Sequence, residues 1–187
     1  GTFGAVHGIG LPQPNRSHFE AMAQIEDADP ASVERRGWIN RMVGLGTNPK
    51  PEQHMALGTA MVPLQLDGPA PVLAAYSVNG LTLPDLWADR HIDEAVVRSW
   101  RGGGAYNKAV RQAVGCTTRL KSLAASDPAA LATVTYPDGP LKDVLLNTAA
   151  LLKAEVGARV VTIDYGDWDM HTGMGNVDDG WMKDHLT

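Results

Sequence analysis

The chain has 187 residues, of which 44% are hydrophobic, and this is enough apolar material for the core of one domain spanning residues 1–187. Its formal net charge is -5 and its basic residues are scattered, so a nucleic-acid partner is not expected. The single cysteine, Cys116, excludes an internal disulfide and a cysteine-rich zinc site, and no stretch reaches the roughly 20 apolar residues of a membrane-spanning helix.

The N-terminal part of the chain predicts a strand, a loop and a helix in that order. Residues 2–9 form an apolar run broken by glycines, which indicates a short strand. Prolines predict a loop over residues 11–15, because a proline ring removes a backbone donor. A helix is predicted to begin near Ser17, since Ser17 and Glu20 form an S-x-x-E capping box in which each side chain satisfies a backbone N–H.

The middle of the chain predicts short helices and strands with less regular patterns. A glycine-rich stretch at residues 102–104 separates two helical segments, because it is too flexible to continue a helix. The expected elements are a helix over residues 37–43, strands over 56–62 and 72–76, and helices over 84–100 and 106–125.

Near the C-terminus, the sequence predicts a helix followed at once by a strand. Apolar residues recur every three or four positions after Pro140, and Gly157 stands where a C-terminal cap belongs. Residues 159–163 are a near-continuous apolar run, typical of a buried strand. Strands joined to helices near both ends of the chain predict an α/β fold in which the strands ending at Ile9 and Ile163 share one mostly parallel sheet.

An acidic cluster with one histidine follows this last strand directly. It contains Asp164, Asp167, Asp169 and His171. Ligands of open α/β sheets bind outside the carboxyl ends of the strands, and close carboxylates favour a divalent cation that offsets their repulsion. Asp169 and His171 would share one face of an extended segment and could hold one ion. A solvated Asp- and Gly-rich turn explains the same residues equally well.

A second group of polar residues surrounds the predicted helix start. Ser17 stands where the helix dipole and the backbone N–H groups favour an anion, and Arg16 could bind phosphate or sulfate oxygens with its guanidinium fork. Ser17 is then a candidate nucleophile, with His18 beside it. The simpler interpretation is that Ser17 only caps its helix and that His18 is a surface residue.

The other histidines and tryptophans show no pattern that points to chemistry. We expect the histidines to stand alone and the tryptophans to lie in the core or in an interface. They are His54, His91 and His185, and Trp38, Trp87 and Trp100.

Three motifs in the same order give the chain a family resemblance. They are residues 14–21, residues 37–41, and residues 160–171 with their Asp-x-His ending. The chain resembles the bacterial family catalogued as domain of unknown function 1501, which is related to the alkaline phosphatase and sulfatase superfamily. Proteins of that family are longer, so the resemblance implies that this chain is a central part. The parts outside it would carry a twin-arginine export signal upstream and an Asp-His-Gly motif downstream, and these flanks or a partner chain would cover the exposed sheet.

The resemblance also implies a fold, a site and two alternative functions. The fold would be a three-layer α/β arrangement with a mostly parallel sheet flanked by helices. Asp169 and His171, with His18 as a third candidate, would bind a divalent metal such as zinc, manganese, calcium or magnesium, and Ser17 and Arg16 would be the catalytic pair. The protein would be an exported, metal-dependent hydrolase of small phosphate or sulfate esters; alternatively, it would be a non-catalytic exported binding or assembly protein. The family usually has glycine where Asp167 stands.

Overall fold

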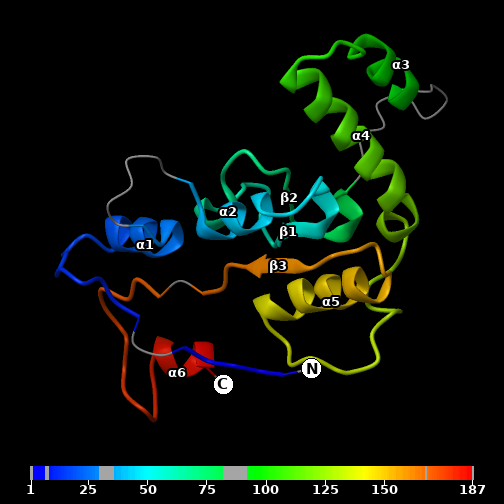
Figure 1. Ribbon diagram of the computed structural model, residues 1–187. Coiled ribbons are helices and arrows are strands. Elements are labelled where there is room, and N and C mark those ends of the chain that lie inside the picture. The colour runs from blue at the N-terminus through cyan, green and yellow to red at the C-terminus, as the bar shows by residue number, and fades with distance from the viewer. Residues whose placement is uncertain (1, 7–8, 30–35, 82–91, 167, 187) are drawn as a thin grey trace.

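The computed structural model describes residues 2–6, 9–29, 36–81, 92–166 and 168–186 (Figure 1). Helices, strands and short 3-10 helices alternate along the chain. The helices are α1 (His18–Asp27), α2 (Trp38–Gly44), α3 (Ile92–Ser99), α4 (Ala105–Ala124), α5 (Pro140–Lys153) and α6 (Trp181–Leu186). The strands are β1 (His54–Leu57), β2 (Leu73–Ala75) and β3 (Val160–Ile163), and the 3-10 helices are η1 (Pro51–Gln53), η2 (Leu64–Leu66) and η3 (Val78–Gly80).

The described strands form one small parallel sheet in the order β2-β1-β3. In the central strand β1, Met55 lies opposite Leu73 of β2 and Val161 of β3. Every residue of β1 is buried, whereas β3 is half-buried along its whole length and has no described strand on its outer side. The chain is therefore a mixed α/β structure with a parallel sheet flanked by helices, as expected, although β3 is less buried than an apolar run suggests.

Alternating side chains of β1 build a separate core on each face of the sheet. Met55 points into a cluster that includes Leu120 of α4 and Leu151 of α5. Ala56 points to the opposite face, where it joins Ile39 of α2. Burying one such Leu or Ile side chain contributes about 1.5–3 kcal/mol, so these two clusters fix the helices against the sheet.

The predicted helix at residues 37–43 is confirmed as α2, and its first residues hold the following loop in place. A Cβ on Gly37 would lie 2.0 Å from the carbonyl oxygen of Leu64, so only glycine allows this close approach. The Asn40 side chain donates to the carbonyls of Leu66 and Ala70 at 2.7 and 3.0 Å, and its Oδ1 accepts from the Ala70 N–H at 3.0 Å. These bonds satisfy buried polar groups, so the motif at residues 37–41 has a structural role.

A partly buried ion pair joins the end of α1 to α2. The Asp27 side chain is buried, and its Oδ1 accepts a 2.8 Å hydrogen bond from Nη1 of Arg41. Nη2 of Arg41 also donates to the Asp27 carbonyl. Because charge-assisted bonds are stronger than neutral ones, this contact sets the position of α1, whose first turn carries Ser17 and His18.

Helix α4 belongs to the core only over its C-terminal half. Cys116 and Leu120 are fully buried there, whereas Tyr106 in the first turn is exposed. Figure 1 shows the N-terminal half of α4 leaving the body of the molecule together with α3. The glycine-rich break predicted at residues 102–104 is confirmed as the connection between these two helices.

The strand predicted at residues 2–9 is wrong. The described residues 2–6 and 9–10 have no secondary structure, and Phe3, Val6 and Ile9 are 95%, 80% and 60% exposed. A strand needs a partner for its backbone groups, and this segment has none among the described strands. The idea that strands ending at Ile9 and Ile163 share a sheet is therefore also wrong.

Several other predictions need smaller corrections. β1 ends at Leu57 because Gly58 turns the chain with a φ of 84°. α5 ends before Gly157, with Ala154 as its cap. Trp38 and Trp100 are 44% and 41% exposed, so neither is a core residue. The expected helix over 84–100 is seen only as α3, and its earlier residues, with Trp87, His91 and Asp167, lie outside the described chain.

No helix in the described part of the chain has the length and apolar character that crossing a membrane requires.

Candidate functional site

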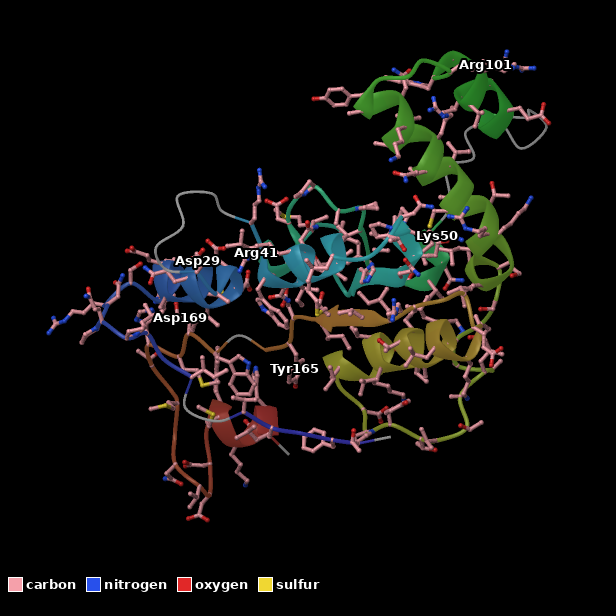
Figure 2. All side chains as sticks on the ribbon, viewed as in Figure 1. Asp29, Arg41, Lys50, Arg101, Tyr165 and Asp169 are labelled. Atoms are coloured by element: carbon pink, nitrogen blue, oxygen red, sulfur yellow. The ribbon has the colours of Figure 1, made fainter. Side chains whose placement is uncertain are left out.

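The three side chains predicted as metal ligands lie together, although they come from opposite ends of the sequence. His18 Nε2 lies 3.3 Å from Asp169 Oδ2, and His171 Nε2 lies 2.9 Å from Asp169 Oδ1. The two imidazole rings are 6.2 Å apart between centroids. Figure 2 shows Asp169 beside α1. One carboxylate therefore lies between two imidazoles at the start of α1, beyond the carboxyl end of β3.

A sharp turn after β3 directs the chain toward α1. Gly166 has a φ of 91°, and a Cβ there would lie 2.2 Å from Nε1 of Trp168. The same indole N–H donates to the Tyr165 carbonyl at 2.7 Å. Only glycine tolerates both this backbone conformation and the contact with the indole, so Gly166 and Trp168 together form the turn.

Asp169 and His171 share one side of their segment, but the segment is not extended as predicted. The Met170 N–H donates to the Trp168 carbonyl at 2.9 Å, and the His171 N–H donates to the Asp169 carbonyl at 3.0 Å. These contacts between residues two apart are those of tight turns. These bonds replace the strand alternation that was expected to place the two side chains on one face.

Ser17 is the N-cap of α1, as the sequence predicts. Its Oγ accepts from the Glu20 N–H at 3.3 Å. The return bond of the capping box is absent, because Oδ1 of Asn15 accepts from the Ser17 N–H at 2.8 Å and Glu20 accepts from Gln24 instead. Ser17 is half-buried and Arg16 is exposed, so both lie at the surface of the helix start.

A carboxylate of α1, that of Glu26, lies near Asp164 at the end of β3. Burial raises the pKa of Glu26, and the negative charge of Asp164 raises it further, while backbone N–H groups of Gln65 and Leu64 act in the opposite direction. The sequence gave no sign of this pair, because Glu26 resembles any surface residue of a helix. Its proximity to Asp164 makes this end of the sheet strongly acidic.

His185, which was expected to stand alone, lies in a group of aromatic rings. Its ring centroid is 5.4 Å from that of Trp168, 6.4 Å from that of Tyr165 and 6.5 Å from that of Trp181. The planes of the His185 and Trp181 rings are nearly parallel. Trp168 and Trp181 remain 43% and 53% exposed. The rings hold α6 against the turn that carries Asp169.

His54 lies away from this site, since it begins β1 at the amino end of the strand. Its side chain is buried, and its Nδ1 has no hydrogen-bond partner among the described residues. Burial lowers the pKa of His54, and the positive charge of Arg159 lowers it further. A neutral structural histidine is the simplest interpretation.

The residue types of the cluster are those of a metal site, but the positions of the side chains are not those of a site ready to hold an ion. Two imidazole nitrogens and a carboxylate are common ligands of zinc and manganese. Across the described ranges, however, no three or more His, Cys, Asp or Glu side chains are arranged to hold an ion. The side chains of His18, Asp169 and His171 are 51%, 47% and 76% exposed, so the cluster lies open to solvent.

Comparison of the chain with models of protein families, with curated proteins and with solved structures gave no match. The resemblance carried by the three sequence motifs therefore stays a prediction.

Proposed function

We propose that this chain carries the site of an exported, metal-dependent hydrolase of small phosphate or sulfate esters, in a fold of the alkaline phosphatase and sulfatase type. One observation supports the proposal most directly. The contact between His18 and Asp169 brings the start of α1 next to the acidic segment that follows β3. A nucleophile at a helix start and ligands at the end of a strand are then within one site.

In this proposal Ser17 is the nucleophile and Arg16 contacts the anion. The N-terminus of α1 favours a negatively charged group, because its first backbone N–H groups and its dipole point toward that group. Ser17 Oγ accepts a hydrogen bond from the Glu20 N–H, which leaves the hydroxyl proton available for transfer. The guanidinium of Arg16 is exposed and can form two parallel hydrogen bonds with phosphate or sulfate oxygens.

His18, Asp169 and His171 would hold the metal. Two nitrogen donors favour zinc over calcium, magnesium and manganese, which prefer oxygen ligands. When bound, such an ion would polarise an ester oxygen and withdraw charge from it. Asp169 already faces both imidazoles, so it would orient the two histidines as well as bind the ion.

A non-catalytic binding protein is the second candidate, and the use of Ser17 as a helix cap favours it. The hydroxyl is already engaged with the Glu20 N–H, and the cluster is open to solvent. A protein that retains only the fold would keep Ser17 for this cap.

Metal content tests the ligand assignment. In the purified protein, Asp169→Asn and His171→Ala should each lower the zinc or manganese content measured by elemental analysis, because each removes a donor. Asp178→Asn is the matched control, since Asp178 is an exposed acid of the same C-terminal region. Equal metal content in all three variants would contradict the proposed ligands.

Substitution of Ser17 separates catalysis from capping. Ser17→Thr keeps a hydroxyl and a cap, whereas Ser17→Asp keeps only the cap. Both variants should have nearly unchanged melting temperatures, and only Ser17→Asp should lose hydrolysis of an aryl phosphate or aryl sulfate. Full hydrolysis by Ser17→Asp would exclude Ser17 as the nucleophile and would leave it as a cap.

A further inference from the structure

A groove separate from the candidate site runs between α4 and the loops that flank β1. Its larger hollow has a volume of about 760 Å³ and lies between the first turns of α4 and the loop around residues 62–72. A second hollow of about 280 Å³ continues it. Asn48, Lys108 and Gln112 line both hollows, so they are two parts of one groove.

The wall of the groove is the same face of α4 that enters the core farther along the helix. Positions three, four or seven residues apart lie on one helical face. Five groove-lining residues of α4 follow this spacing: Ala105, Lys108, Ala109, Gln112 and Arg119. Tyr106 and Arg111 also line the groove and flank this face on its two sides. Leu123 continues the same face and is buried. The groove is therefore the place where α4 separates from the body and leaves its inner face uncovered.

One end of the groove is strongly basic. Lys50, Lys108, Arg111 and Arg119 line the smaller hollow, and no carboxylate lines it. Glu52 pairs with Arg119 at 2.6 and 2.9 Å, but the other three have no ion pair among the described residues. Arg111 donates only to backbone carbonyls of the turn between α3 and α4. In a protein with a net charge of -5, this local positive charge favours a negatively charged ligand.

The other end of the groove is mostly apolar and open. Val62, Pro71, Val72 and Ala109 are among its lining residues, with Asp67 as its carboxylate, and the 84% exposed Tyr106 stands at its rim. Small-molecule sites usually enclose their ligand with a few convergent polar groups. Two connected hollows, one mostly apolar and one basic, fit an extended peptide better.

We propose that this groove binds an acidic peptide segment that also carries apolar side chains. Carboxylates of the peptide would pair with Lys50, Lys108 and Arg111, and an apolar side chain would lie against Val72 beside Tyr106. Figure 2 shows Lys50 and Asp169 far apart on the molecule. The topology agrees, because Lys50 precedes β1 at the amino edge of the parallel sheet and Asp169 follows β3 at its carboxyl edge. Peptide binding and hydrolysis would thus be independent properties.

The test is fluorescence anisotropy with a short labelled peptide that alternates Glu and Leu. The protein should bind it saturably, and Lys50→Glu and Lys108→Glu should each weaken binding by about tenfold. Lys121→Glu is the matched control, because Lys121 is exposed and lies on the opposite face of α4. This control variant should bind like the unmodified protein, and added salt should weaken binding in both.

Three results would overturn the proposal. The first is the absence of saturable binding. The second is a loss of affinity in Lys121→Glu as large as that in Lys50→Glu and Lys108→Glu. The third is complete displacement of the peptide by inorganic phosphate at millimolar concentration, which would indicate a simple anion site. Tyr106→Ala tests the contribution of the apolar end of the groove to binding, because it removes an exposed ring without changing charge. It should weaken binding of the Glu-Leu peptide but not of a peptide made of Glu alone. Circular dichroism of every variant verifies that the fold is kept.

Discussion

Replacing Arg41 with methionine should destabilise the protein strongly, although the Arg41 side chain is itself 41% exposed. The substitution removes the cation that pairs with Asp27, whose carboxylate is fully buried. The second oxygen, Oδ2, already has no hydrogen-bond partner among the described residues. Without Arg41, the carboxylate would be left buried with neither a counter-charge nor a bond to its Oδ1.

The size of the effect follows from the burial of the two partners. Removing one partner of a buried ion pair costs roughly 3–5 kcal/mol, because the remaining charge loses its compensation. The Arg41 side chain is 41% exposed, so water screens part of the interaction and the lower value applies. We therefore expect a loss of about 3 kcal/mol in the free energy of unfolding, or about 6–12 °C in melting temperature for a chain of this size.

Urea denaturation followed by circular dichroism measures this loss. Arg41→Met should lower the urea midpoint with an unchanged slope, which indicates a change in stability and not in compactness. The double variant Arg41→Met/Asp27→Asn should recover much of the loss, because it removes the buried charge as well. The reasoning is refuted if Arg41→Met changes stability by less than about 0.5 kcal/mol, or if the double variant is as unstable as Arg41→Met.

Three further predictions concern acid residues and the core. Burial is the largest single effect on the pKa of Glu52 and raises it, but the hydrogen bonds and positive charge of Arg119, together with hydrogen bonds from a backbone N–H and from Cys116, outweigh burial and lower the pKa. This pair should therefore stabilise the fold above the ordinary pKa of 4.5 and lose that effect as the pH falls. Glu52→Gln should flatten the acid side of a stability-versus-pH curve. The pKa of Glu26 is raised, so its charge disfavours the fold as the pH rises through that pKa, and Glu26→Gln should increase the urea midpoint at neutral pH but not well below pH 4.5. Leu151→Ala should cost about 2–5 kcal/mol because Leu151 is fully buried, whereas Ala at its 55% exposed neighbour Leu152 should cost clearly less in the same assay.

The parts of the fold that the sequence predicts best are those with a strong local pattern. α5 has apolar residues at helical spacing, and β3 is a short apolar run, and both lie close to the predicted positions. The strand at residues 2–9 had the same kind of apolar run but has no described partner. Pairing of strands depends on residues far away in sequence, so an apolar run alone does not determine it.

Residue type and motif resemblance suggest His18, Asp169 and His171 as a group, and the structure brings these three side chains into contact. Their role as metal ligands stays a prediction, and the geometry of their contact does not follow from the sequence. The turn at Gly166 could not be inferred, because the reason for glycine there is the contact with the indole of Trp168. Glu26 was missed for a similar reason, since only the folded chain brings it near Asp164.

The outer edge of β3 is a surface on which a second chain could pair. A half-buried parallel strand with no described neighbour on one side offers backbone N–H and C=O groups to any other chain that approaches. Arg159 and Asp164 flank the four apolar or β-branched residues of this strand with opposite charges. Such flanking charges act as gatekeepers against aggregation, because stacking two copies of the strand in parallel would bring like charges together. Besides its repulsion of Glu26, Asp164 is therefore expected to oppose parallel pairing of the β3 edges of two molecules.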